Sequence, residues 1–575
     1  MTQLVQVRHY LTMKIGFIVF LITYASSSFA AQNPWSKDAT LPGKMKCFIK
    51  HNKKICLSSG NRKNILNRND MDEAIKNGST HALSYPVTVS ELQVPFKAVM
   101  AYFNSDTNSP IRRYIYKITQ GASGLKDIDQ IYKWVGLHKY PKQKQKASPN
   151  IIYNLHKFDH ERMGATITET DKGAKQLTFS CAACHSSDLF GVKVLGMSNR
   201  FPRANEFFYY GKKLLALTST AVFKGILNPS KEEIQIYKKS KNAIRYINLK
   251  KPKALGLDTS LAQVGLSLAK RADDKYASRK VWNSIFPRKN KLSKRPADSK
   301  PAVWWNLKYK TKWLSDGSVR SGNPVFTNFL WNEIGRGTDL RKLETWLDEN
   351  QDIVDDLTSY VFNTEPPKYN DFFPNEIDIA KAKRGQTTFR KNCISCHGDY
   401  EKGWELNSSE DYIQKIKTTK TWYHTRTVTI DVGTDPYRYE GMEYFYKDLN
   451  KLQISKSSGA VVTPQKGYVP PPLVGVWARW PYFHNNSAPT LYDVLTPDYK
   501  RPKKYYAFEA IDKDKDFDKV KNGYPTKKND RKYLFDTTRS GLSNVGHTFM
   551  LIDENGQEKF SHNQKIEIIE FLKTL

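Results

Sequence analysis

The chain has 575 residues, of which 39% are hydrophobic and 13% aromatic, and its formal net charge is +34. This length indicates about three to four units rather than one simple core, and the apolar content excludes a disordered chain. The charge favours acidic proteins or an anionic membrane surface as partners, or a solvated lysine-rich face without any partner; with no nucleic-acid motif present, we expect no nucleic acid partner.

Residues 1–30 have the order of a secretory signal peptide. Arg8 and Lys14 precede the apolar run Ile15–Tyr24, and small residues follow as far as Ala30. The run is well short of the ~20 residues that a membrane anchor needs. We therefore predict cleavage and a periplasmic or secreted protein.

Residues 31–165 form an N-terminal extension without a cofactor motif. It contains Cys47 and Cys56, which we predict to close a small disulfide loop in an oxidising compartment; two free thiols are the alternative. It also contains three histidines that are more typical of surface or hydrogen-bonded positions than of metal ligands: His138, His156 and His160.

Two pentapeptides, Cys181–His185 and Cys393–His397, have the pattern CxxCH of a c-type haem attachment site. Two thioether bonds to one porphyrin need thiols one helical turn apart, and the next residue supplies an imidazole nitrogen to the iron. A single copy could be part of a zinc or redox motif, but two copies in an exported chain favour two covalently bound haem c groups. The predicted cofactor-binding residues are Cys181, Cys184, His185, Cys393, Cys396 and His397.

The first haem segment, residues 166–365, surrounds its motif with arginines and aromatic residues. Arg200 and Arg203 follow the motif closely enough to neutralise haem propionates, whereas Met197 has too little chain to reach the opposite haem face. Trp304 and Trp305 are typical of core packing, and either indole could also bridge two redox centres. Apolar periodicity predicts helices over 260–277 and 339–361.

The second haem segment, residues 366–575, begins after the helix-stopping Pro366 and Pro367. Gly385 precedes the second motif in a stretch that resembles the entry helix of the cytochrome c fold, where a glycine lets a C-terminal helix cross closely. An apolar helix face near Leu575 is the candidate partner. Local chemistry leaves the sixth ligand of this haem open between three histidines: His484, His547 and, more weakly, His424.

These stretches resemble the bacterial di-haem cytochrome c peroxidase superfamily, and more closely its large branch with the rubber oxygenases and di-haem fatty-acid dioxygenases. Besides the two motifs, the resemblance rests on segments that span most of residues 175–575: 199–206, 304–305, 385–397, 432–436, 472–491 and 543–549. It implies a mainly α protein with two cytochrome c-like haem domains, long loop-rich insertions and an N-terminal extension.

The resemblance also implies a division of labour between the haems. His185 would be the proximal ligand of a haem with an open distal side, the reaction centre, while His397 and His547 would ligate a closed second haem. His484 would lie near a haem without ligating iron, and Trp304 or Trp305 would lie between the haems. Asn485–Asn486 and Arg479–Trp480 depart from the residues common in the relatives.

The expected activity is therefore a haem-dependent oxidation at the first site. We expect dioxygen addition to a C=C bond of a long unsaturated lipid or polyisoprenoid. The alternatives are reduction of hydrogen peroxide with electrons from a small donor protein, and plain electron transfer with both irons six-coordinate.

Overall fold

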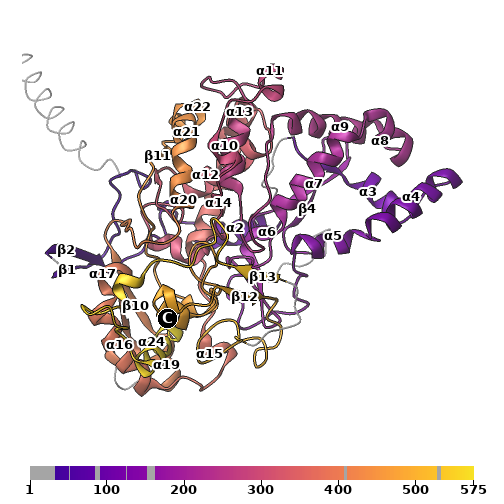
Figure 1. The fold of residues 1–575 in the computed structure, drawn as a ribbon. Helices are drawn as coiled ribbons and strands as arrows, with labels where there is room; N and C mark the ends of the chain where they lie inside the picture. The colour runs from indigo at the N-terminus through magenta and orange to yellow at the C-terminus, as the bar shows by residue number, and fades with distance from the viewer. Residues whose placement is uncertain are drawn as a thin grey trace, which may run out of the picture.

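The computed structural model describes residues 33–50, 52–84, 91–124, 126–151, 162–406, 411–526 and 533–575. The predicted signal peptide lies outside these ranges. Within them, no helix is both long enough and apolar enough to cross a membrane. Helices make up most of the regular structure, and the strands form small antiparallel sheets (Figure 1).

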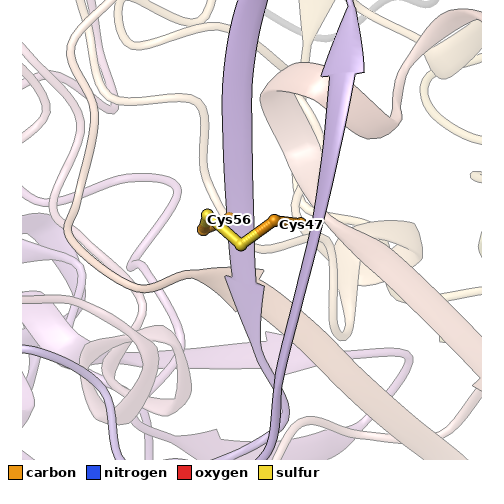
Figure 2. Close-up of a disulfide and its surroundings, with 2 residues drawn as sticks. All are labelled: Cys47 and Cys56. Atoms are coloured by element: carbon orange, nitrogen blue, oxygen red, sulfur yellow. A yellow bond between two sulfur atoms is a disulfide. The ribbon is translucent and has the colours of Figure 1, made fainter.

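The N-terminal extension begins with a hairpin of β1 (Met45–Lys50) and β2 (Lys53–Ser58). Cys47 lies directly opposite Cys56 across the hairpin and forms a disulfide with it, which confirms the predicted loop (Figure 2). β2 pairs with β10 (Thr419–His424), which pairs in turn with β9 (Asp399–Lys402). The hairpin is therefore built onto the second haem segment.

Later parts of the extension join the first haem segment instead. β3 (Val94–Pro95) pairs with β5 (Lys175–Phe179), which pairs with β4 (Ala165–Glu169). Helix α2 (Met71–Ser84) packs closely on α14 (Gln351–Asn363), because a Cβ atom at Gly78 would lie only 2.1 Å from a backbone oxygen of α14. The extension is thus interleaved with both haem segments.

Two helices of the first haem segment are shorter than the apolar periodicity predicts. The stretch 339–361 is divided at Asn350 into α13 (Leu340–Glu349) and α14. The stretch 260–277 is helical only as α10 (Ser260–Leu268), since the chain then turns to bury Arg271. Its guanidinium donates hydrogen bonds to two backbone oxygens near the end of α12 (Pro324–Gly335), and this ties the turn to that helix.

Further helices extend to one side of the molecule (Figure 1, right). They are α3 (Phe96–Phe103), α4 (Pro110–Ser123), α5 (Ile128–Val135), α7 (Ala204–Leu217), α8 (Thr220–Leu227) and α9 (Lys231–Ala243). A separate short helix, α11 (Val281–Ile285), lies at the upper edge of the view.

The second haem segment is organised by the crossing of α16 (Ile379–Asn392) and α24 (His562–Lys573). A Cβ atom at Gly385 would lie 1.9 Å from the backbone oxygen of Glu567, so only glycine permits this approach. Beside the crossing, the rings of Phe389 and Phe571 lie 5.3 Å apart. The close contact with a terminal helix that Gly385 predicts is therefore present.

We expect Gly385→Val to destabilise the protein by about 3 kcal/mol or more, because the added side chain must push two packed helices apart. Gly211→Ala is the matched control, since Gly211 is also helical and has no atom near the Cβ that it would gain. The control should change stability by no more than about 1 kcal/mol. Denaturant unfolding measures both, and equal midpoints for Gly385→Val and wild type would contradict the close crossing.

Candidate functional site

A cavity of about 550 Å³ extends between the two CxxCH motifs. All four motif cysteines and both motif histidines line it. His547, His484 and Trp304 line it as well, from distant parts of the sequence. The fold therefore brings most of the predicted site residues onto one continuous space.

The backbone holds the first motif tightly in its short helix, α6 (Ala182–His185), directly after β5. Gly196 N–H donates a hydrogen bond to the carbonyl of His185 at 2.7 Å. Asn199 N–H donates to the carbonyl of Cys184 at 2.9 Å, and the Asn199 side-chain amide donates to that of Ala183 at 2.9 Å. These bonds fix the direction in which the two thiols and the imidazole point.

The second motif is held in a comparable way in α17 (Ile394–His397), which follows α16. The hydroxyl of Tyr400 donates to the carbonyl of His397 at 2.8 Å. The Nε2 atom of His424 lies 2.9 Å from the carbonyl oxygen of Cys396, and His424 does not line the cavity. His424 therefore contacts the backbone of the motif outside the cavity and is not placed to ligate the iron.

Both motif histidines present one free ring nitrogen. Nδ1 of His185 lies 2.9 Å from the carbonyl oxygen of Ala302, and Nδ1 of His397 lies 3.1 Å from that of Pro471. A carbonyl only accepts, so each Nδ1 carries the hydrogen and Nε2 keeps its lone pair. Burial lowers the pKa of both imidazoles to about 4, which keeps them in the neutral form that binds metals.

His547 faces His397 across the cavity. Their ring centroids lie 6.4 Å apart, with an interplanar angle of 69°. Two metal–nitrogen bonds of about 2 Å each, together with the two ring radii, span a similar distance. His547 also has a pKa lowered to about 4 by burial. The pair fits two axial ligands of one iron.

The backbone conformation around His547 explains how this side chain reaches the cavity. His547 has a φ of +64°, and its N–H donates to the carbonyl of Val432 at 2.7 Å. A Cβ atom at Gly546 would lie 2.4 Å from the backbone nitrogen of Thr434. Two loops far apart in the sequence therefore press together and hold the imidazole in place.

His484 is engaged by a tyrosine. Its ring stacks on Tyr468 with centroids 4.0 Å apart, and Nε2 lies 3.0 Å from the Tyr468 hydroxyl. That hydroxyl donates its single hydrogen to the carbonyl of Asp435 at 2.5 Å, so His484 Nε2–H donates to it. With Nε2 protonated, this nitrogen has no lone pair for iron, in keeping with the expectation that His484 lies near a haem without ligating it.

The described lining of the cavity offers His185 no obvious counterpart. Its imidazoles are those of His185, His397, His484 and His547, and its one methionine is Met550. Met197 is buried in the core and His138 is half-buried, and neither lines the cavity. His156 and His160 lie outside the described residues. Among the described residues, the candidate iron position at His397 therefore has two imidazoles, whereas the one at His185 has a single imidazole.

The two tryptophans occupy different environments. The Trp304 ring lies 5.0 Å from the His185 ring and lines the cavity. Trp305 is fully buried, donates through Nε1 to the carbonyl of Val474 at 3.0 Å and does not line the cavity. Of the two, Trp304 is the residue placed beside a candidate iron ligand.

The thiols fit covalent attachment better than redox or zinc chemistry. None of the four motif cysteines forms a disulfide, and burial raises the pKa of Cys181, Cys184 and Cys393 to about 12. A reactive redox cysteine has a lowered pKa instead. In the described part of the chain, no three His, Cys, Asp or Glu side chains gather as metal ligands.

The two arginines expected to neutralise propionates, Arg200 and Arg203, make contacts with other protein groups. Arg200 stacks on Trp480 at 3.9 Å and donates to backbone carbonyls, while Arg203 donates to the carbonyl of Trp134 and the hydroxyl of Tyr533. Neither lines the cavity. Both follow the motif in sequence, but the chain turns their side chains toward the surrounding protein.

Five other cations line the cavity: Lys300, Lys310, Arg336, Arg438 and Arg479. None of them pairs with a carboxylate of the described residues. Burial lowers the pKa of Lys310 to about 8 and that of Arg479 to about 10. Asp258 is the one carboxylate among the described residues that line the cavity, and with Glu333 it acts on Arg336. Because the cations exceed it in number and charge removed from water is costly when unpaired, this cavity fits an anionic occupant. The propionates of a haem supply such charge.

Arg336 lies close enough to Cys181 and Cys184 to perturb their pKa values. We expect Arg336→Gln to lower the midpoint potential of the haem at these cysteines by roughly tens of millivolts, because a nearby cation favours the reduced iron. Arg200→Gln, a buried arginine off the cavity, is the control. Spectroelectrochemistry would contradict the assignment if both variants kept the wild-type potentials or shifted them equally.

Comparison with known families agrees with this chemistry. Residues 467–506 match a family model described as RoxA-like, cytochrome c-like. The matched segment contains Pro471, whose carbonyl binds the His397 ring, as well as Tyr468 and His484. The match supports a haem oxidoreductase of the rubber oxygenase-like cytochrome type and implies haem c as the cofactor.

Two curated relatives come from Sinorhizobium fredii (strain NBRC 101917 / NGR234). Uncharacterized protein y4iJ is 26% identical over 253 residues, which cover 36% of this chain and 41% of the relative. Uncharacterized protein y4iM is 29% identical over 147 residues, which cover 23% of this chain and 32% of the relative. The matches therefore span less than half the length of either relative.

Proposed function

We propose that the chain is a periplasmic di-haem c dioxygenase that adds dioxygen to a C=C bond of a long unsaturated lipid or polyisoprenoid. The observation that carries the proposal is the inequality of the two iron positions. His397 faces a second imidazole at a distance suited to one iron, whereas His185 faces no such group among the described residues.

The chain's own residues would hold the two haems as follows. Cys181 and Cys184 would form thioethers to the first porphyrin, with His185 as its ligand oriented by the Ala302 carbonyl. The second porphyrin would be held by its own motif and His547. A haem iron with an open position supplies the activation of dioxygen or peroxide, and one with two protein ligands supplies electron storage.

The cavity wall supports an apolar substrate at the first site. Phe329 of α12 and Leu357 and Val361 of α14 line the cavity and are buried. Such a wall excludes water and packs against a hydrocarbon chain. Trp304 packs against the His185 ring and so limits its rotation.

The experiment is oxygen uptake by the isolated haem-loaded protein with oleate or polyisoprene. We expect consumption of dioxygen and products that contain both atoms of ¹⁸O₂ by mass spectrometry. No uptake and no oxygenated product with either substrate would refute the proposal. Peroxide-dependent oxidation of a reduced small cytochrome would favour the peroxidase alternative. In that case the haem held by His397 and His547 would accept the electrons from the donor.

A further inference from the structure

A compact cluster of exposed apolar side chains lies within one short stretch of the described chain, at α11. Val281, Trp282, Ile285 and Phe286 are 56%, 70%, 62% and 56% exposed, and we call these four residues the α11 knob. The Trp282 and Phe286 rings pack on each other with centroids 4.4 Å apart. Figure 1 shows α11 at the edge of the molecule. Clustered exposed apolar side chains of this kind mark interaction sites.

The knob is exposed although its backbone is held in place, because Ser284 and Arg288 form hydrogen bonds and an ion pair with neighbouring residues. Lys270 Nζ donates to the carbonyl of Ser284. Arg288 N–H donates to the carbonyl of Ala269 at 2.9 Å, and the Arg288 guanidinium donates to that of Leu268 at 3.0 Å and forms an ion pair with Asp448 at 3.2 Å. The fold therefore holds these apolar side chains in solvent.

The stretch of chain that contains the knob is basic, and its three arginines are paired with Glu91, Asp448 and Glu440. Residues 279–297 contain no Asp or Glu. Four lysines of this stretch are exposed and form no ion pair with described residues: Lys280, Lys289, Lys291 and Lys294. Exposed ammonium groups without ion pairs, before and after an exposed apolar tip along the chain, match a surface with many anionic groups above an apolar layer.

We propose that the α11 knob docks the protein on an anionic lipid surface. Trp282 and Phe286 enter the interfacial layer, where aromatic rings are preferred, and the four lysines lie over the lipid phosphates. An acidic protein fits less well, because the protruding tip would need a matching apolar hollow, and lysines are point charges without the directional fork of arginine.

The knob is also connected to the cavity wall along the chain. The chain runs from Phe286 through the lysine-rich loop to Ala297, and residues 297 and 299–304 line the cavity beside His185. If the knob docks on a membrane, only a short stretch of chain separates the lipid surface from this part of the cavity wall. The proposed docking depends on the knob and the nearby charges alone, so it can be tested without any enzymatic activity.

The test is cosedimentation of the haem-loaded full chain with vesicles of phosphatidylcholine, with or without about one third phosphatidylglycerol. We expect strong binding only to the anionic vesicles, weakened by high salt. The double variant Trp282→Ser/Phe286→Ser should bind about tenfold more weakly or worse. The matched control Leu214→Ser/Leu217→Ser removes two exposed apolar side chains of α7, which are 67% and 87% exposed, and should bind as wild type.

Fluorescence supplies a second readout that loss of folding would not imitate. Brominated phosphatidylglycerol should quench part of the tryptophan emission of the wild type, and Trp282→Phe, with an unchanged haem spectrum, should lose that quenching. Equal binding to both vesicle types, undiminished binding of Trp282→Ser/Phe286→Ser or equal loss in the α7 control would overturn the proposal. Binding to acidic proteins with none to vesicles would do so as well.

Discussion

Replacement of His547 by alanine is expected to open the second haem. The wild-type iron at His397 should be low-spin, because the imidazoles of His397 and His547 face each other with ring centroids 6.4 Å apart and are both strong ligands. Without His547 the iron keeps one protein ligand, so the absorption and electron paramagnetic resonance spectra should acquire a high-spin component. The reduced variant should then bind carbon monoxide at two haems instead of one.

Two further variants keep this result interpretable. His547 has a φ of +64°, which glycine adopts without strain, so His547→Gly should give the same spectra with less loss of stability. His138→Ala removes a half-buried imidazole that does not line the cavity and should leave both haems unchanged. Added imidazole should restore the low-spin spectrum of His547→Gly. A low-spin second haem in both His547 variants would contradict its role as ligand.

The double variant Cys181→Ser/Cys184→Ser is expected to lose one covalent haem and all oxygenase activity. Both thiols line the cavity, and serine cannot form the thioethers. Mass spectrometry should show the loss of one haem mass. The low-spin spectrum of the haem at His397 and His547 should persist, because its cysteines and ligands lie in the other segment.

Cys393→Ser/Cys396→Ser is the matched variant at the second motif. It should lose the low-spin haem and retain carbon monoxide binding at the first. If removal of the second motif abolished carbon monoxide binding while removal of the first did not, the roles of the two sites would be reversed.

Two features that the sequence predicts are present in the structure, one local and one between distant segments. Cys47 and Cys56 pair across a tight hairpin. Gly385 lies where only a residue without a side chain admits the terminal helix. The disulfide follows from local pairing in a tight hairpin, whereas the Gly385 contact is expected from the resemblance of its stretch to the entry helix of the cytochrome c fold.

Features that depend on distant chain segments, and that no resemblance suggests, could not be predicted from the sequence. Arg200 follows the first motif but stacks on Trp480, whereas Arg336 and Arg438 reach the cavity from other helices. Apolar periodicity did not reveal the helix end at Leu268, because burial of Arg271 against the end of α12 is a tertiary effect. The sequence contains no signal for the cavity cations, because Lys310 lies between Lys308 and Lys312 and nothing in that run distinguishes it from its neighbours.

The inequality of the two iron positions is tested most directly by carbon monoxide titration of the fully reduced wild-type protein. The account predicts one carbon monoxide per chain, bound at the haem of Cys181 and Cys184, with the other haem unchanged. Binding of none would indicate two six-coordinate electron-transfer centres. Binding of two would show that His547 does not close the second haem, and either result would contradict the account.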